Sequence, residues 1–185
     1  MIELFDRNAM RILTVFSLSR GSRLNRKTIK ELTQMPNIIA DKTLAKLINH
    51  NFLTKEKNLF ALNFENEEAK KIVQMCFERY NKFKHLPLKE YFTVLDIRDE
   101  ISKIKNPGDV YLFGSYAKLT FNEKSDIDIA IVSDNVSKRD VDAVVRKLEK
   151  KYKKTIEVHR FTRKFYNNKR DALVKEIIQH GIRLI

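Results

Sequence analysis

The chain has 185 residues, of which 37 are Lys or Arg and 24 are Asp or Glu, so its formal net charge at pH 7 is +13. A hydrophobic fraction of 43% with only 4 Gly and 3 Pro is typical of a globular protein and excludes a collagen-like or largely disordered chain. This length fits one domain or two small ones and excludes a large multidomain protein. The positive charge favours polyanionic partners such as nucleic acid or nucleoside triphosphates.

The sequence predicts a cytoplasmic protein with no membrane partner. Charged residues at positions 3, 6, 7 and 11 interrupt any signal-peptide segment, and no run approaches about 18 apolar residues. The single cysteine, Cys76, lies in an apolar stripe at helical spacing and is interpreted as a buried core residue. The four histidines are scattered, and no pair has metal-ligand spacing.

The N-terminal third of the chain has the pattern of three helices followed by a β-hairpin. Helical spacing of apolar residues predicts helices over 6–18, 25–35 and 39–49. Two short apolar runs, 52–55 and 59–63, flank a polar turn and predict the hairpin. This order resembles the winged helix-turn-helix superfamily over residues 5–64, and we assign residues 1–65 to such a domain.

The winged-helix resemblance implies a DNA-binding surface. In such folds the third helix enters the major groove and the hairpin wing contacts the backbone. The residues that would face DNA are Asp41, Lys42, Thr43 and Lys46 on the helix and Lys55 and Lys57 on the wing. Five basic residues with no acid among them suit phosphate contacts: Arg20, Arg23, Arg26, Lys27 and Lys30. Winged helices also serve as protein-docking or dimerisation modules, and a homodimer is expected if the domain reads a palindrome.

Residues 66–107 are predicted to be a helical connector. Apolar periodicity indicates helices over about 67–83 and 88–105, with a break at His85-Leu86-Pro87 and a sharp end at Asn106-Pro107-Gly108. The segment is an interdomain spacer, a dimerisation surface or the opening helices of the second domain, and the sequence does not decide among these.

From residue 108 onward the pattern predicts an α+β domain with a small mixed sheet flanked by helices. Strands are expected over 110–113, 127–132 and 155–161, and helices over 138–152 and 165–179. Residues 114–124 are expected to form a loop. The run 137–154 is rich in Lys and Arg, but its apolar residues recur at helical spacing, so we interpret it as a solvated helix face.

The most specific motif of the chain is Gly114-Ser115 followed after ten residues by Asp126-Ile127-Asp128. Side chains alternate along a strand, so both aspartates point to one face while Ile127 points into the core. Two neighbouring carboxylates repel each other unless a cation intervenes, and Mg²⁺ suits such a pair. An exposed Asp pair that caps a strand is the alternative interpretation.

This G-S-x10-D-x-D spacing resembles the signature of the DNA polymerase β-like nucleotidyltransferase superfamily, over residues 108–185. The resemblance implies two Mg²⁺ ions and attack of a hydroxyl on the α-phosphate of a nucleoside triphosphate, with release of pyrophosphate. Asp126 and Asp128 would be catalytic and metal-binding, and Gly114 and Ser115 would bind the triphosphate.

Two further residues complete the candidate site. Lys118 is a candidate phosphate ligand, at a position where relatives often carry Arg followed by Gly, and Leu119 replaces that Gly here. Glu157 is the candidate third catalytic and metal-binding carboxylate, where relatives more often carry Asp. Alternation along its strand would place Glu157, with Thr155 and His159, on the face beside Asp126 and Asp128. The alternative for Glu157 is a solvated strand residue paired with Lys or Arg. His159 is a candidate for substrate contact, and its alternative is a surface histidine without that contact.

We carry two functional hypotheses. The first is a Mg-dependent enzyme that moves a nucleoside monophosphate, AMP from ATP, to a hydroxyl of a protein, small molecule or nucleic acid. Minimal nucleotidyltransferases include antitoxins that adenylylate a HEPN-class toxin, so such a toxin is a candidate partner. The second is a transcriptional regulator whose nucleotidyltransferase-like domain senses nucleotide without turnover.

Overall fold

The computed structural model describes residues 6–83 and 85–185. The chain divides into two compact units, Met1–Phe92 and Thr93–Ile185, and the division falls inside the segment predicted to be a connector. The first five residues of the predicted domain 1–65 lie outside the described residues. Among the described residues, no helix combines the length and the apolar character needed to cross a bilayer.

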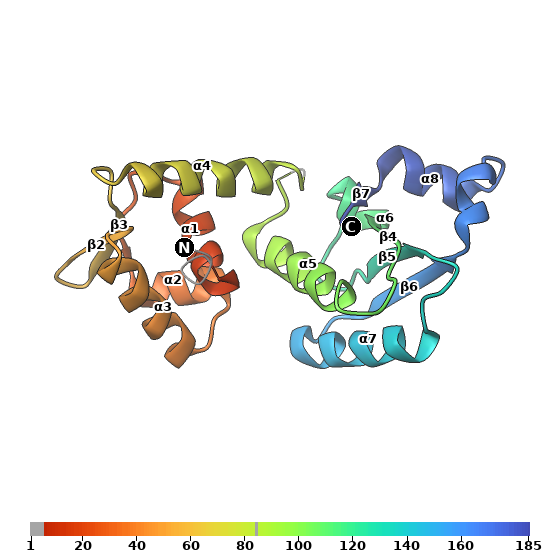
Figure 1. The fold of residues 1–185 in the computed structure, drawn as a ribbon, viewed down its shortest axis with the longest axis horizontal. Helices are drawn as coiled ribbons and strands as arrows, with labels where there is room; N and C mark the ends of the chain where they lie inside the picture. The colour runs from red at the N-terminus through yellow and green to blue at the C-terminus, as the bar shows by residue number, and fades with distance from the viewer. Residues whose placement is uncertain (1–5, 84) are drawn as a thin grey trace. The chain divides into compact units, whose positions relative to one another are not determined.

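The N-terminal unit contains helices and a small sheet (Figure 1). Its elements are α1 (Arg7–Leu18), β1 (Leu24–Asn25), α2 (Arg26–Thr33), α3 (Asn37–Asn49), β2 (Leu53–Glu56), β3 (Leu59–Leu62) and α4 (Glu67–Asn81). The strands form an antiparallel sheet in the order β1-β3-β2. Side chains of Asp6, Asn25 and Asn66 cap α1, α2 and α4, which explains where these helices begin. The predicted three helices and hairpin are confirmed, and the short strand β1 was not predicted.

The core of the N-terminal unit extends from α1 to α4. Ile12, Phe16 and Leu47 are fully buried in it, and Val73 of α4 packs into the same cluster. Cys76 is 1% exposed in this cluster, so the prediction of a buried core cysteine is confirmed. The first helix of the predicted connector therefore shares its core with α1.

The C-terminal unit is built around a four-stranded mixed sheet. The division between the units falls inside α5 (Leu88–Ile101). The elements that follow are β4 (Asp109–Phe113), α6 (Gly114–Lys118), β5 (Ile127–Val132), α7 (Lys138–Tyr152), β6 (Ile156–Phe161), the 3-10 helix η1 (Arg163–Asn167), α8 (Ala172–His180) and β7 (Ile182–Arg183). The strand order is β6-β5-β4-β7, with β5 and β6 parallel and the other pairs antiparallel. The helix predicted over 165–179 is wrong in its first part: the chain forms η1 there, and α8 begins only after Asp171, whose side chain caps it.

Helices cover both faces of this sheet (Figure 1). On the α8 face, Phe113 and Ala130 form a buried cluster with Val174 and Ile177. Because side chains alternate along β5, Asp128 lies on the same face as Ala130, while Ile127 and Ile129 face the other side. The predicted alternation in β5 thus delivers a carboxylate to the α8 face.

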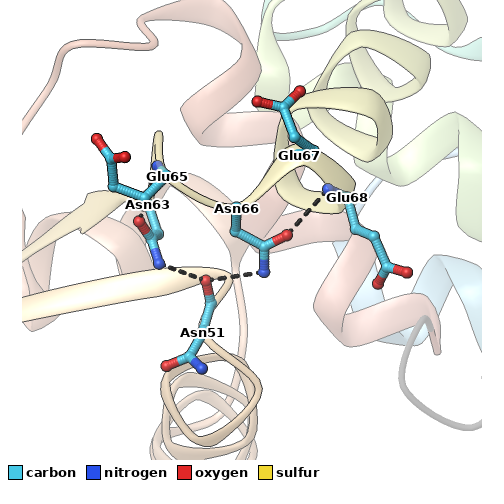
Figure 2. Close-up of a pocket in the computed structure, with 6 residues that line it drawn as sticks. All are labelled: Asn51, Asn63, Glu65, Asn66, Glu67 and Glu68. Atoms are coloured by element: carbon cyan, nitrogen blue, oxygen red, sulfur yellow. Dashed lines mark hydrogen bonds between the residues drawn. The ribbon is translucent and has the colours of Figure 1, made fainter.

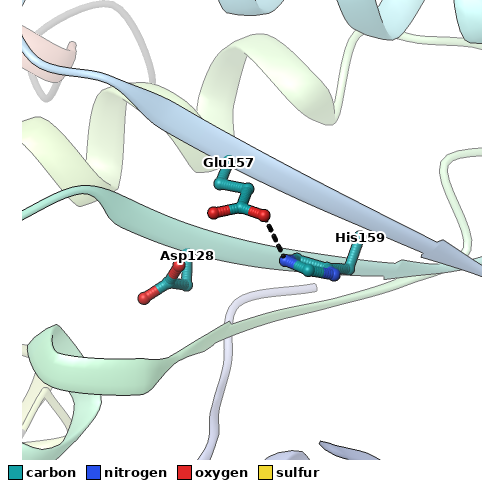
Figure 3. Close-up of side chains that lie close together, drawn as sticks. All are labelled: Asp128, Glu157 and His159. Atoms are coloured by element: carbon teal, nitrogen blue, oxygen red, sulfur yellow. Dashed lines mark ion pairs between the residues drawn. The ribbon is translucent and has the colours of Figure 1, made fainter.

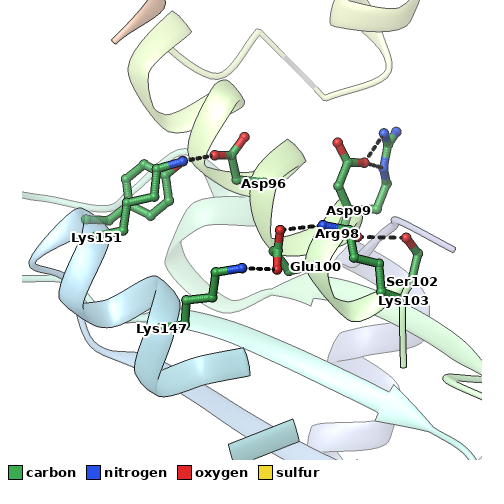
Figure 4. Close-up of polar contacts among 9 residues, drawn as sticks. Asp96, Arg98, Asp99, Glu100, Ser102, Lys103, Lys147 and Lys151 are labelled. Carbon is green, nitrogen blue, oxygen red and sulfur yellow. Dashed lines mark hydrogen bonds and ion pairs between the residues drawn. The ribbon is translucent and has the colours of Figure 1, made fainter. Parts of the chain in front are cut away.

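Ion pairs tie α7 to the part of α5 that belongs to this unit (Figure 4). Asp96 is 1% exposed and accepts hydrogen bonds from Lys151 Nζ, at 2.5 Å, and from the Tyr152 hydroxyl. Glu100 binds Lys147 Nζ at 2.7 Å. The basic run 137–154 is therefore not only a solvated helix face, because two of its lysines neutralise carboxylates of α5.

Candidate active site

The turn from β4 into α6 brings Gly114 against Asp128. Phe113 and Asp128 are paired in the antiparallel register of β4 and β5, so Gly114 follows directly beside the aspartate. Gly114 has φ +65°, in the left-handed region that favours glycine, and a Cβ atom there would lie 2.0 Å from Asp128 Oδ2. Only glycine therefore fits at this position while the carboxylate stays where it is.

Three side chains with metal-binding chemistry converge on the α8 face: Asp128, Glu157 and His159 (Figure 3). Asp128 and Glu157 are in register on the parallel strands β5 and β6, and His159 lies two residues further along β6 on the same face. One ligand atom from each residue lies within 4.8 Å of the other two, and His159 Nε2 is 3.0 Å from Glu157 Oε1. The structure thus brings the predicted Asp128 and Glu157 together and adds a histidine.

The electrostatics of this cluster favour a bound cation. Burial raises the pKa of Asp128 above its usual value, and the negative charge of Glu157 raises it further, while His159 opposes the shift. Asp126 and Glu176 add smaller repulsive contributions to the pKa of Asp128. A divalent cation would relieve this repulsion between carboxylates.

The other residues of the predicted motif surround the cluster less closely. Asp126 is exposed immediately before β5, and its carboxylate is outside the compact group of Asp128, Glu157 and His159. Ser115 is partly exposed in α6, and its carbonyl oxygen accepts a hydrogen bond of 3.0 Å from the Thr120 N–H. The motif therefore folds into one turn and one strand start, with Asp128 as its innermost carboxylate.

Lys118, the predicted phosphate ligand, pairs with an acidic residue that sequence reasoning missed. Its Nζ atom lies 2.7 Å from Glu176 Oε1 on α8. The next residue, Leu119, ends α6 with φ +60°, the left-handed conformation for which the Gly of relatives is suited. No local pattern marks Glu176, because its contact with α6 depends on how α8 packs.

The predicted DNA-facing residues have different environments in the N-terminal unit. Lys42, Lys55 and Lys57 are exposed, and Lys46 Nζ lies 3.1 Å from Asp6 Oδ2. Thr43 is a correction: its side chain is 5% exposed, and its hydroxyl donates a hydrogen bond of 2.7 Å to the Ile39 carbonyl inside α3. It is not available for a contact with DNA.

Three of the five basic residues between 20 and 30 have partners within the unit. Arg20 donates a hydrogen bond to Gln74, and Arg23 lies 2.5 Å from Glu56. Arg26 forms two hydrogen bonds with the carboxylate of Asp41, another predicted DNA-facing residue. The two pairs with carboxylates, of Arg23 and Arg26, reduce the positive charge that this segment offers to phosphates.

An open pocket of the N-terminal unit has an acidic and amide lining (Figure 2). The Asn51 carbonyl accepts hydrogen bonds from the side-chain amides of Asn63 and Asn66, at 2.9 and 3.1 Å. Glu65, Glu67 and Glu68 complete the lining. None of the predicted site residues lines this pocket.

Comparison with known proteins assigns the C-terminal unit. Residues 94–184 match the model of the nucleotidyltransferase domain family. Comparison with curated proteins finds no significant match. Among solved structures, a toxin-antitoxin with AMP-PNP is 22% identical with a TM-score of 0.37, covering 49% of this chain and 70% of that chain. A mutant of the toxin-antitoxin MntA-HpeT is 24% identical with a TM-score of 0.35, covering 52% of this chain and 72% of that chain. The family match identifies residues 94–184 as a nucleotidyltransferase domain.

Proposed function

We propose that the C-terminal unit transfers a nucleoside monophosphate from a nucleoside triphosphate to a hydroxyl acceptor. ATP is the expected donor, so the transferred group is AMP. The observation that carries the proposal is the convergence of Asp128 and Glu157 beside the Gly114 turn, inside residues that match the nucleotidyltransferase family. The predicted motif and the family match point to the same chemistry. The acceptor hydroxyl belongs to a protein, a small molecule or a nucleic acid, and a HEPN-class toxin is one protein candidate.

The donor set fits a divalent metal. Asp128 and Glu157 would hold the ion, and Asp126 supplies a further carboxylate at the start of β5. Burial and the neighbouring charge of Glu157 raise the pKa of Asp128, which supports a cation at this point. When bound, such metal ions stabilise the charge that develops on the transferring phosphoryl group.

The residues of the chain have separate roles in this reaction. Gly114 leaves the space that the Asp128 carboxylate occupies, and Ser115 in the same turn would contact phosphate oxygens. Lys118 would leave its ion pair with Glu176 and bind a phosphate of the substrate instead. The acceptor oxygen bonds to the α-phosphorus, the bond from that phosphorus to the bridging oxygen breaks, pyrophosphate leaves, and Glu157 accepts the hydroxyl proton.

Label transfer tests the proposal. The purified chain is incubated with each α-labelled nucleoside triphosphate and Mg²⁺, alone and with cell extract, beside Asp126→Asn, Asp128→Asn and the control Asp142→Asn on α7. We expect labelled acceptor with the wild type and the control and loss of label with the two site variants. Label transfer that survives Asp128→Asn, or its absence under all conditions, would contradict the proposal.

A second function, DNA binding, is proposed for the N-terminal unit. Helices α1 to α3 with the β1-β3-β2 sheet follow the order of a winged helix, and Lys42, Lys55 and Lys57 are exposed on α3 and the β2–β3 hairpin. If this unit reads a palindrome, the protein acts as a homodimer. A regulator of this kind would bind duplex DNA with a steep salt dependence.

Binding to a library of duplexes, with the salt concentration varied, checks this second function. Substituting Lys42, Lys55 and Lys57 by Gln should weaken the salt dependence of DNA binding. The slope of log affinity against log salt concentration should fall in magnitude by about one for each lost phosphate contact. The matched control replaces Lys150 on α7 by Gln. If DNA affinity and slope are the same in the triple variant and the wild type, the N-terminal unit has another role, such as protein docking.

A further inference from the structure

The cluster on the α8 face contains a nitrogen donor that the carboxylate chemistry does not require. We propose that His159 is a metal ligand and that, with Asp128 and Glu157, it makes the site selective for a later transition-metal cation such as Co²⁺ over Mg²⁺. This inference rests on the proposed function, because it concerns the metal that the nucleotidyltransferase site would bind.

The spacing of the three side chains agrees with shared coordination. Two adjacent ligands of a six-coordinate cation, each about 2.1 Å from the metal and at a right angle, are about 3.0 Å apart. The distance between His159 Nε2 and Glu157 Oε1 is 3.0 Å. Asp128 supplies the third ligand atom, a carboxylate oxygen that lies within 4.8 Å of a ligand atom of each of the other two residues. A cation can therefore replace the contact between imidazole and carboxylate without a large movement of the strands.

The fold holds the imidazole in this position. His159 is in register with Ala130 on β5, a fully buried residue. The ring of Phe113 on β4 contacts the imidazole edge to face, with ring centroids 5.4 Å apart. Such packing restricts the rotamers of a ligand and so lowers the entropy lost when it binds a metal. The side chain of His159 remains 32% exposed, so an ion can reach it.

The chemistry of the donors sets the preferred metal. Mg²⁺ and Mn²⁺ suit carboxylate and water ligands, whereas imidazole suits later first-row metals. Affinity for any site rises from Mn²⁺ to Co²⁺ along the first-row series. The contribution of His159 is therefore the part of the Co²⁺ affinity that is lost when the imidazole is replaced.

Metal titration of the full chain tests the proposal without the reaction. Calorimetry with Mg²⁺, Mn²⁺ and Co²⁺ is done on the wild type, His159→Gln, Asp128→Asn and the matched control His50→Gln, whose histidine lies in the N-terminal unit. We expect the wild type and the control to bind Co²⁺ at least about tenfold more tightly than Mg²⁺. His159→Gln should lose about tenfold in affinity for Co²⁺, while its Mg²⁺ and Mn²⁺ affinities change less than about threefold.

A measurement on the wild type keeps the test independent of how the variant folds. Substoichiometric Co²⁺ should shift or broaden the imidazole NMR signals of His159 before those of the other three histidines. Unchanged Co²⁺ affinity in a folded His159→Gln, or a Co²⁺ effect that spares His159, overturns the inference. If Asp128→Asn still abolishes binding in that case, the carboxylate site and the proposed function stand. If the wild type binds no cation, both fail.

Discussion

Gly114 and Asp128 fit together only because residue 114 has no side chain. A Cβ atom at Gly114 would lie 2.0 Å from Asp128 Oδ2 and 2.9 Å from its carboxyl carbon. The two residues belong to different halves of the G-S-x10-D-x-D motif, and the pairing of β4 with β5 brings them into contact. The glycine of the motif thus secures the position of a carboxylate as well as a tight turn.

Gly114→Ala should displace the Asp128 carboxylate and weaken metal and nucleotide binding at least about tenfold. The clash and the φ of +65° should also lower the free energy of unfolding by about 1 to 3 kcal/mol. The control is Gly21→Ala, because a Cβ there meets nothing within 4 Å; its effect on stability should stay within about 0.5 kcal/mol. Calorimetry and denaturant unfolding measure both effects, and equal behaviour of the two variants would show that the carboxylate can move freely.

Glu176→Gln should tighten nucleotide binding. The substitution frees Lys118 from its 2.7 Å ion pair and removes a negative charge that acts on Asp128. A partly exposed ion pair contributes up to about 1 kcal/mol, so the affinity for nucleoside triphosphate should rise by about two- to fivefold. Equilibrium binding of a labelled nucleotide measures this, with Glu31→Gln as the control. Weaker binding would mean that Glu176 positions Lys118 for the phosphate.

Lys151→Met should destabilise the C-terminal unit. Asp96 is 1% exposed, so removing Lys151 leaves a buried carboxylate with less compensation, at a cost of about 1 to 3 kcal/mol. Lys150→Met changes a neighbouring exposed lysine and should alter stability by less than about 0.5 kcal/mol. Urea unfolding at neutral pH compares the two. Equal stability would show that the Tyr152 hydroxyl and its surroundings are enough for Asp96.

Much of the fold follows from local patterns, and the exceptions have physical reasons. The strand Ile127–Val132 and the helix Lys138–Tyr152 were predicted with the bounds they have, because each shows strong periodicity. The strands β1 and β7 have two residues each, too few for any pattern. Helix α8 begins later than predicted because the polar residues 168–171 separate it from η1.

The candidate site was predictable only where strand geometry decides it. Alternation places Asp128 and Glu157 on one face, and the parallel register then aligns them. The sequence favours a surface histidine at position 159, because only the pairing of β5 with β6 brings His159 close to Asp128. Thr43 was assigned to the wrong face of α3, since its buried neighbours Leu44 and Leu47 place it toward the core.

Cys76 should resist alkylation in the native protein. Burial raises the pKa of its thiol to about 11. At pH 8 the thiolate fraction would be roughly 200-fold below that of a thiol with the ordinary pKa of about 8.5. Iodoacetamide labelling followed by mass spectrometry should therefore show slow reaction at pH 8, faster reaction as the pH rises toward 11, and rapid reaction in denaturant. Rapid labelling of native protein at pH 8 would show that α4 separates readily from α1.

The most direct test of the central claim compares two positions of the label in one substrate. The chain is incubated with ATP labelled at the α-phosphate or at the γ-phosphate, in parallel, with Mg²⁺ or Mn²⁺ and cell extract, beside Asp128→Asn. Nucleotidyl transfer predicts that only the α-label reaches the acceptor, that the γ-label leaves as pyrophosphate, and that Asp128→Asn abolishes both. Transfer of the γ-label to the acceptor, or α-label transfer that persists in Asp128→Asn, would contradict the account.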